Sequence, residues 1–253
     1  MIEVQNIKKA FIDKAVLKGI STVFETGKVN MVIGASGSGK TVFMKCLVGL
    51  MQPDSGHIFY DSTNFTSLST REKKSIRTKI GMLFQGSALF DSMTVEENVL
   101  FPLDMFTNMT RKEKMDRVSF CLERVNLVGA NQKYPAEISG GMMKRVGIAR
   151  AIVLNPKYLF CDEPNSGLDP QTALLIDQLI IDITQEFNMT TIMNTHDMNS
   201  VMGIGEKVVF LHKGEKNWEG SNQEILKSHN EILNDFIFAS DFLKQLRKGI
   251  ALD

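Results

Sequence analysis

One stretch of sequence decides how this chain folds: Gly34-Ala35-Ser36-Gly37-Ser38-Gly39-Lys40-Thr41. It fits the pattern G-x-x-x-x-G-K-[S/T]; the short apolar run 29–33 before it predicts a buried strand, and residues 41 to about 50 predict a helix. A strand, a glycine turn and a helix N-terminus in this order aim backbone N–H groups and the positive end of a helix dipole at one point. Such a point attracts phosphate, so the stretch predicts binding of a nucleoside triphosphate.

The side chains at the end of this loop have predicted roles of their own. The Lys40 ammonium would reach the terminal phosphates, and the Thr41 hydroxyl would bind the Mg²⁺ ion that accompanies them. A chance glycine-rich turn is the alternative, and the flanking strand and helix argue against it. The predicted nucleotide contacts in the loop are Gly34, Ala35, Ser36, Gly37, Ser38, Gly39, Lys40 and Thr41.

Composition narrows the classes of function. The chain has 253 residues, 43% of them hydrophobic, which suits one large α/β domain or two small ones. Lys plus Arg and Asp plus Glu both number 29, so no field of a single sign attracts nucleic acid, and we expect no nucleic-acid partner. The three cysteines lie far apart in apolar contexts, which predicts buried thiols in a reducing compartment and no cysteine metal site.

The ends and the apolar runs of the chain bear on its location. The N-terminal residues alternate like a strand and carry no leader pattern, so we expect a protein that is neither secreted nor imported. No apolar run approaches the roughly 20 residues of a membrane span. Any role at a membrane is therefore expected to come through a partner.

The order of the predicted elements indicates an α/β protein. Strands precede the loop, a mainly helical segment covers about 94–154, and strands alternate with helices from 158 onward, which predicts parallel strands with crossover helices. We expect a main domain over 1–225, with the helical segment inserted in it, and a helical C-terminal extension over 226–253. This extension carries apolar residues that predict either packing on its own domain or contact with a partner. They are Ile232, Leu233, Phe236, Ile237, Phe238, Phe242, Leu243 and Leu246.

Two adjacent carboxylates, Asp162 and Glu163, end the apolar run 158–161. If the strand period of two continues through them, they point to opposite sides and can have two roles. Asp162 is placed to hold Mg²⁺ through water, and Glu163 to polarise the water that attacks the γ-phosphate. Without the phosphate loop, a solvated strand end would explain the two acids equally well.

Gln85 and His196 also follow predicted strands, at 80–84 and 190–194. The carboxyl ends of parallel strands form the edge where open α/β sheets bind ligands. We therefore expect Gln85 to bind Mg²⁺ and water, and His196 to sense the γ-phosphate. The predicted catalytic residues are Glu163, His196 and Gln85, and the predicted metal ligands are Thr41, Gln85 and Asp162.

A second phosphate site is predicted at Ser139-Gly140-Gly141, directly before the helical run 144–154. Ser139 is the expected N-cap, and the two glycines leave N–H groups open to an anion. A plain helix cap is the alternative reading of this motif.

In this order the motifs resemble those of an ABC transporter ATPase, and the resemblance covers nearly the whole chain. It implies a P-loop NTPase fold with a RecA-like core, an antiparallel β subdomain and a helical subdomain. It also implies that ATP and Mg²⁺ are bound, that Phe11 stacks on the adenine ring, and that Asp169 belongs to the nucleotide site. Finally, it implies a head-to-tail homodimer in which Ser139, Gly140 and Gly141 of one subunit complete the ATP site of the other.

The finer resemblance is to the ATPase subunit of Mla or Mce type phospholipid transporters, on the runs 85–95, 98–103 and 139–145. Two departures from most cassettes agree with it: Val42 follows Thr41, and Met142 stands where glutamine is usual. Val42 is placed in the nucleotide site, but it lacks the hydroxyl that commonly touches the α-phosphate.

This finer resemblance implies an integral membrane permease as partner and, through it, a lipid-binding Mce-domain protein outside the membrane. The chain is then a peripheral ATPase at the cytoplasmic face of a bacterial inner membrane that energises lipid transport. The segment 85–102 is the expected coupling surface, and a helix buried in its own domain is the alternative. The apolar residues expected to form a docking groove there are Leu89, Phe90, Met93, Val95 and Phe101.

Other functions stay open at this point: an ABC ATPase for a different substrate, a soluble ABC switch acting on ribosomes or DNA, and a P-loop small-molecule kinase. The single cassette, the zero net charge and the lack of a long coiled-coil insertion argue against the switch. A kinase has no need of Ser139-Gly140-Gly141 or His196.

Overall fold

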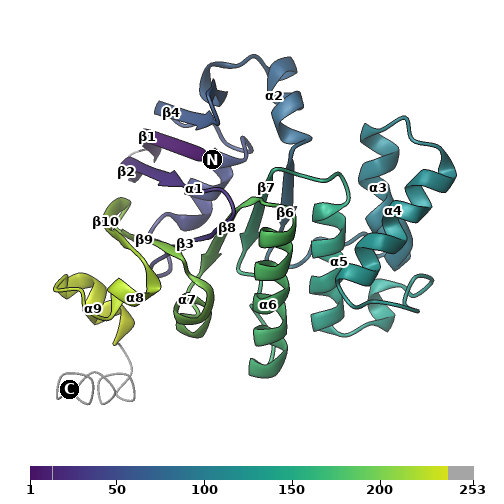
Figure 1. Ribbon diagram of the computed structural model, residues 1–253. Coiled ribbons are helices and arrows are strands. Elements are labelled where there is room, and N and C mark those ends of the chain that lie inside the picture. The colour runs from purple at the N-terminus through teal and green to yellow at the C-terminus, as the bar shows by residue number, and fades with distance from the viewer. Residues whose placement is uncertain (13, 239–253) are drawn as a thin grey trace. The chain divides into compact units, whose positions relative to one another are not determined.

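The structure is a computed structural model that describes residues 1–12 and 14–238. The chain forms two compact units. Among the described residues, the first consists of 1–12, 14–24, 29–66 and 194–238, and the second of 25–28 and 67–193. Figure 1 shows the elements of both, coloured by residue number. The predicted domain boundaries at 225 and 226 stay a prediction.

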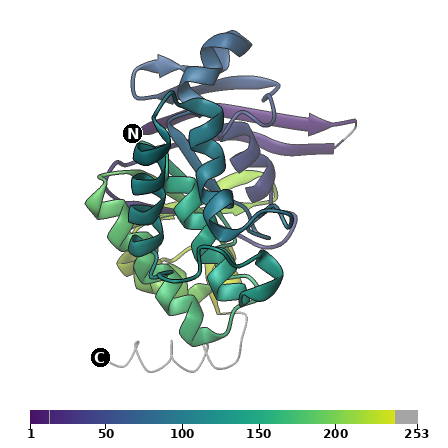
Figure 2. The same cartoon turned by 90° about the vertical axis from the view of Figure 1, so that its right-hand side faces the viewer.

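The strand-rich N-terminal sequence folds into an antiparallel sheet of the first unit. Figure 2 shows its first two strands, in purple, paired side by side. Ile2, Val4 and Ile7 of the first strand are buried between exposed or half-buried neighbours, so one face of this sheet supplies core. The order in the sheet is β2 (Lys14–Phe24), β1 (Ile2–Phe11), β4 (Ser55–Tyr60) and β5 (Thr63–Asn64).

The strand before the phosphate loop is buried along its whole length. This strand, β3 (Val29–Ile33), pairs in parallel with β9 (Lys207–His212), which pairs antiparallel with β10 (Glu215–Gly220). Strands buried on both faces have near-continuous apolar runs, and the sequence signal at 29–33 has this form. The α-helices of the first unit are α1 (Lys40–Leu47), α7 (Met198–Ile204), α8 (Asn222–Ile225) and α9 (Glu231–Ile237).

The second unit combines parallel strands with helices. β6 (Ile80–Leu83) pairs in parallel with β7 (Tyr158–Asp162), and β8 (Thr190–Thr195), whose first four residues belong to this unit, follows β7 in the strand order. The predicted helical segment 94–154 holds three α-helices that contact one another, with a 3₁₀ turn at Pro135–Glu137 between the last two. The α-helices of this unit are α2 (Thr70–Arg77), α3 (Val95–Phe106), α4 (Arg111–Arg124), α5 (Gly140–Ile152) and α6 (Pro170–Glu186).

Reciprocal caps fix where several helices begin. Three capping boxes are headed by Thr94, Thr110 and Ser221. In each, the hydroxyl accepts from the N–H three residues on, and the glutamate there accepts from the cap N–H. A fourth box, Ser69 with Glu72, starts α2, a helix that the sequence analysis missed.

Helix α5 packs very closely on β6. A Cβ added to Gly81 of β6 would lie 2.3 Å from the Ala151 carbonyl oxygen of α5. A Cβ added to Gly147 of α5 would lie 2.6 Å from Leu83 Cδ1. The two glycines therefore permit a distance between helix and strand that any larger residue would increase.

The described part of the C-terminal extension packs on its own unit. Leu233, Ile237 and Phe238 are buried, and the Phe236 ring stacks on Phe210 of β9 at 5.2 Å between centroids. Ile232 is exposed. The remaining predicted apolar positions, Phe242, Leu243 and Leu246, lie outside the described residues.

Candidate nucleotide site

The phosphate loop has the local geometry that its sequence predicts. β3 ends at Ile33, α1 begins at Lys40, and the residues between them turn tightly. Gly34 has φ 149°, and a Cβ there would lie 2.3 Å from the Leu211 carbonyl oxygen, so no other residue fits. Gly39, the N-cap of α1, is left-handed with φ 105°, a conformation that glycine adopts without a steric penalty.

Lys40 lies folded into the loop. Its ammonium donates to the carbonyl oxygens of Gly34, at 2.6 Å, and Ala35, at 3.3 Å, and the residue is 9% exposed. Within the described chain the buried Ser38 hydroxyl has no hydrogen-bond partner. A fixed cation and an unsatisfied hydroxyl beside a helix N-terminus fit a phosphate ligand.

Phe11, the residue predicted to contact adenine, belongs to the same unit as the phosphate loop. The Phe11 side chain ends β1 and is 42% exposed, which is unusual for a large apolar ring. The Lys9 ammonium lies 5.7 Å from the centre of this ring and 2.5 Å from an Asp54 carboxylate oxygen. Phe11 is therefore an exposed ring at the end of a paired strand, as stacking on a base requires.

His196 is exposed directly after β8, between two residues that fix the local turn. The Asp197 N–H donates to the Thr195 hydroxyl at 3.0 Å, and the Asp197 carboxylate caps α7 by accepting from the Asn199 N–H at 2.9 Å. The turn presents His196 to solvent at the carboxyl end of its strand, as predicted.

On the second unit, Gln85 follows β6, and the two carboxylates lie at the end of the adjacent strand β7. The Gln85 amide nitrogen donates to the Ser166 hydroxyl at 3.4 Å, which joins the loops after these strands. β7 ends at Asp162, and Glu163 is left-handed with φ 51°. The condition for sending the two acids to opposite sides, a strand that continues through both, is therefore not met, because the extended backbone stops before Glu163.

The predicted second phosphate motif forms a helix start. The Ser139 hydroxyl accepts from the Met142 N–H at 3.2 Å, and Ser139 and Gly140 are exposed. Gly141 is buried, and a Cβ there would lie 2.6 Å from Thr172 Cγ2 of α6. This arrangement leaves an exposed helix N-terminus that can meet an anion from outside the unit.

Asp169 has a structural role that the sequence analysis did not foresee. Its carboxylate caps α6, accepting from the N–H groups of Gln171 and Thr172 at 3.1 and 3.0 Å and from the Thr172 hydroxyl at 2.5 Å. These hydrogen bonds, led by that from the Thr172 side chain, lower the pKa of Asp169. Its contact with nucleotide stays a prediction.

The residues predicted to bind Mg²⁺ supply suitable donors. Thr41, Gln85 and Asp162 offer a hydroxyl, an amide oxygen and a carboxylate, the oxygen ligands that Mg²⁺ prefers. Among the residues that the structure describes, no group of three or more His, Cys, Asp and Glu side chains is arranged to hold a metal ion.

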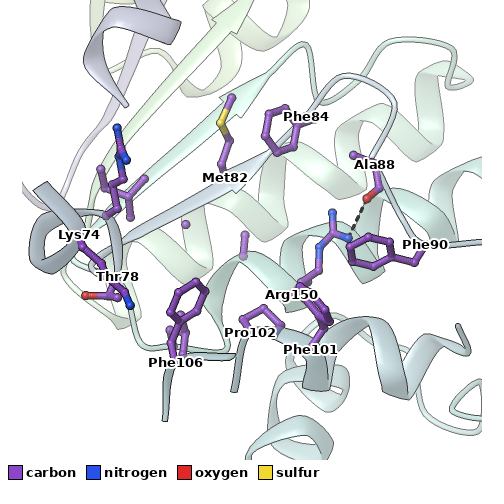
Figure 3. Close-up of a pocket in the computed structure, with 15 residues that line it drawn as sticks. Lys74, Thr78, Met82, Phe84, Ala88, Phe90, Phe101, Pro102, Phe106 and Arg150 are labelled. Carbon is purple, nitrogen blue, oxygen red and sulfur yellow. Dashed lines mark hydrogen bonds between the residues drawn. The ribbon is translucent and has the colours of Figure 1, made fainter. Parts of the chain in front are cut away.

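An apolar groove of about 510 Å³ lies beside the segment after Gln85. Phe84 and Met82 stand on one side of it, and Phe101, Pro102 and Phe106 on the other (Figure 3). Its full lining is Lys74, Arg77, Thr78, Ile80, Gly81, Met82, Phe84, Ala88, Phe90, Phe101, Pro102, Phe106, Arg150, Ala151 and Leu154.

The groove agrees only partly with the predicted docking residues. Phe90 and Phe101 line it, with ring centres 4.8 Å apart, but Leu89 and Met93 are not in the lining and Val95 is buried in the protein core. The sequence analysis missed the contributions of α2 and α5. The Ser69-x-x-Glu72 pattern could have revealed α2.

Comparison with known proteins defines the class of protein to which this fold and site belong. Residues 17–166 match the family model described as ABC transporter, and the chain belongs to that family. It has the fold of an ABC ATPase and is an ATP-binding subunit of an ABC transporter, so the predicted α/β fold and the predicted ATPase activity are confirmed. Solved cassettes similar to it include one described as dimeric and one described as part of a transporter complex.

Two relatives are similar over most of the chain. The chain is 38% identical over 236 residues to the probable ribonucleotide transport ATP-binding protein mkl of Mycobacterium leprae, covering 93% of this chain and 68% of that protein. It is 38% identical over 241 residues to the methionine import ATP-binding protein MetN of Carboxydothermus hydrogenoformans, covering 94% and 71%. The chain thus spans about two thirds of these relatives.

Two solved structures are similar. The dimeric ATP-binding cassette MJ0796, in a post-hydrolysis state bound to ADP and Pi, has a TM-score of 0.81 and 30% identity over 88% of this chain and 99% of that one. The protein cbiO1 of Clostridium perfringens, part of the transporter complex cbiONQ, has a TM-score of 0.84 and 27% identity over 99% and 98%. Over residues 1–12 and 14–238, none of the helices has the length and apolar character needed to cross a bilayer.

Proposed function

We propose that this ATPase energises the transport of a lipid, most simply a phospholipid, through a separate permease that works with an Mce-type lipid-binding protein. The observation that carries the proposal is the sequence of its site: Val42 after the loop threonine, Met142 in the motif that caps α5, and the run from Gln85 to Phe101 along the groove. In this proposal the chain works at the cytoplasmic face of a bacterial inner membrane.

A second candidate is an importer of another solute. The 38% identity to proteins named for ribonucleotide transport and for methionine import favours it. The two candidate functions use the same ATPase subunit and differ in the permease, because in both proposals other chains bind the substrate.

The ATP site would be shared by two copies of the chain. The phosphate loop of one copy would hold the nucleotide, and the exposed Ser139 and Gly140 of the other would cover it, with Asp169 and Phe11 at its edges. Because each copy offers both surfaces, two identical sites form in a two-fold symmetric dimer.

The proposed hydrolysis uses the residues that the proposal assigns to this site. Lys40 and the loop N–H groups hold the β- and γ-phosphates, and bound Mg²⁺ would neutralise phosphate charge. Glu163 accepts a proton from a water whose oxygen attacks the γ-phosphorus, while His196 and Gln85 orient that phosphate and the water. The bond from the γ-phosphorus to the bridging oxygen breaks, its electron pair stays on ADP, and the proton leaves with phosphate.

The groove is the proposed docking site of the permease. Most of its lining residues are apolar. Lys74, Arg77 and Arg150 contribute cations, and among the described lining residues none is acidic. A cytoplasmic helix with an apolar face and a carboxylate at its edge would complement it.

Phe106→Asp tests this docking, because Phe106 is 48% exposed in the groove and its replacement leaves the protein core intact. Recovery of the permease on the purified ATPase should fall about tenfold or more, as for loss of a hot-spot residue. Val128→Asp is the control, since Val128 is 81% exposed and is not among the residues that line the groove. Equal permease recovery by both variants would contradict the docking site.

The transported substrate is tested on the whole complex. The chain is purified from detergent-solubilised membranes, its partner proteins are identified, and bound lipids are analysed by mass spectrometry. A multispanning protein with a phospholipid supports the proposal. A permease without lipid but with a polar solute supports the second candidate, and recovery with ribosomes or without any membrane protein overturns both.

A further inference from the structure

A buried lysine of helix α5 joins the two loops that carry the predicted chemistry. Lys144 is 5% exposed, and its ammonium donates to the backbone carbonyl of Gln85 and, at 3.4 Å, to that of Glu163. All three residues belong to the second unit. One side chain from the helix capped by Ser139 therefore holds the backbone at the ends of both β6 and β7.

The backbone that this lysine holds is in an uncommon conformation. Glu163 has φ 51°, and non-glycine residues stay in the left-handed region only where surrounding contacts require it. In the loop that follows Gln85, Ser87 and Ala88 are also left-handed, with φ 60° and 47°. Their carbonyls accept from Arg150 of the same helix, at 2.6 and 2.8 Å.

The surroundings of Lys144 act on its pKa in two opposite directions. Burial lowers its pKa, whereas Cys161 and the carboxylates of Glu163 and Asp162 act in the opposite direction. The two carbonyl oxygens are acceptors in a part-buried place, and each needs a donor there. An apolar side chain of the same length would fill the space and leave both carbonyls without this partner.

We propose that Lys144 is a positioning residue for ATP hydrolysis: it fixes the backbone of Glu163 relative to Gln85 and so holds the Glu163 carboxylate in its working orientation. The inference rests on the proposed role of Glu163 as the base. Lys144 itself touches neither nucleotide nor water in this scheme. Its loss should slow the chemical step and leave nucleotide binding unchanged, because the phosphate loop belongs to the other unit.

The experiment compares Lys144→Met, Lys144→Arg and the control Arg145→Met in the full-length chain. Arg145 is the next residue of the helix, and its guanidinium also donates to backbone carbonyls, those of Asn126 at 2.8 Å and Val125 at 3.4 Å. Phosphate release gives kcat and KM for ATP, and titration with a fluorescent ATP analogue gives affinity and the number of folded sites. Expressing kcat per titrated site separates slow chemistry from loss of folded protein.

Lys144→Met should lower kcat roughly tenfold to a hundredfold with KM and affinity within about threefold, the scale of a misplaced catalytic group. Lys144→Arg, which keeps a cationic donor, should recover most of the loss, and Arg145→Met should stay near the wild type. The proposal is overturned if kcat per site of Lys144→Met is close to wild type, if arginine restores nothing, or if Arg145→Met loses as much. A Glu163→Gln arm separates the two ideas: near-normal turnover there refutes the role of Glu163, whereas its loss beside a normal Lys144→Met refutes only the positioning role.

Discussion

Gly81→Ala tests how tightly the framework of the site is packed. Gly81 lies in β6, four residues before Gln85, and a Cβ there would lie 2.3 Å from the carbonyl oxygen and 3.0 Å from the carbonyl carbon of Ala151. Both contacts are with backbone, so no side chain can rotate to relieve them. Helix α5 and β6 must therefore move apart, which also disturbs the carbonyls that Lys144 holds.

The size of the effect follows from what each added methyl would meet. Overpacking costs about 1–3 kcal/mol, and a backbone clash this short places Gly81→Ala near 3 kcal/mol. Gly147→Ala meets the movable Leu83 Cδ1 at 2.6 Å and gains up to about 1 kcal/mol of helix propensity, so a net loss of about 1 kcal/mol is expected. Gly203 of α7 has nothing within 4 Å of its added Cβ, and Gly203→Ala should stabilise the protein by about 0.5 kcal/mol.

The assay is urea unfolding followed by far-ultraviolet circular dichroism, with all variants at one protein concentration. With a slope of about 3 kcal/mol/M, the expected loss for Gly81→Ala lowers the midpoint by about 1 M. The expected order of stability is Gly203→Ala, wild type, Gly147→Ala and then Gly81→Ala. A midpoint for Gly81→Ala equal to wild type, or above that of Gly147→Ala, would refute the packing argument.

The remaining predictions concern the groove and the nucleotide. Asn98→Ala should destabilise the protein by about 3 kcal/mol in the same urea assay. The fully buried Asn98 amide accepts from the Phe90 N–H at 2.8 Å and donates to the carbonyls of Phe90, Met93 and Thr94. A loss below about 1 kcal/mol would contradict this prediction. Lys40→Ala should weaken binding of a fluorescent ATP analogue about tenfold to a hundredfold, and unchanged affinity would mean that the loop is misread. Glu163→Gln should retain that binding but lower phosphate release by about 10²–10⁴-fold, and a turnover near wild type would remove Glu163 from its role.

The local parts of the site could be predicted from sequence because their causes lie in consecutive residues. The phosphate loop needs left-handed glycine and a helix N-terminus, and Gly34 to Lys40 supply both within one turn. The helix caps at Thr94 and Ser139 depend on hydrogen bonds over three residues. Patterns of this range need no knowledge of the rest of the fold.

Other features could not be predicted from the sequence, and the reason is physical. The left-handed backbone of Glu163 depends on how the chain leaves β7, where alternation no longer applies. The burial of Val95 shows the same limit, because an apolar residue in a helix does not reveal whether it faces the core or a groove.

By itself, the sequence predicted a nucleotide-binding loop at 34–41 and showed the resemblance to an ABC transporter ATPase, because these signals are short-range and ordered along the chain. Only the tertiary structure decided that Lys144 reaches Gln85, 59 residues away, and that Arg150 reaches Ser87, 63 residues away. Such bonds depend on the close approach of α5 to β6, which two separate glycines permit. A contact between distant segments leaves no periodic pattern in either one, so the groove and the lysine bridge become visible only when the helix is packed on the strand.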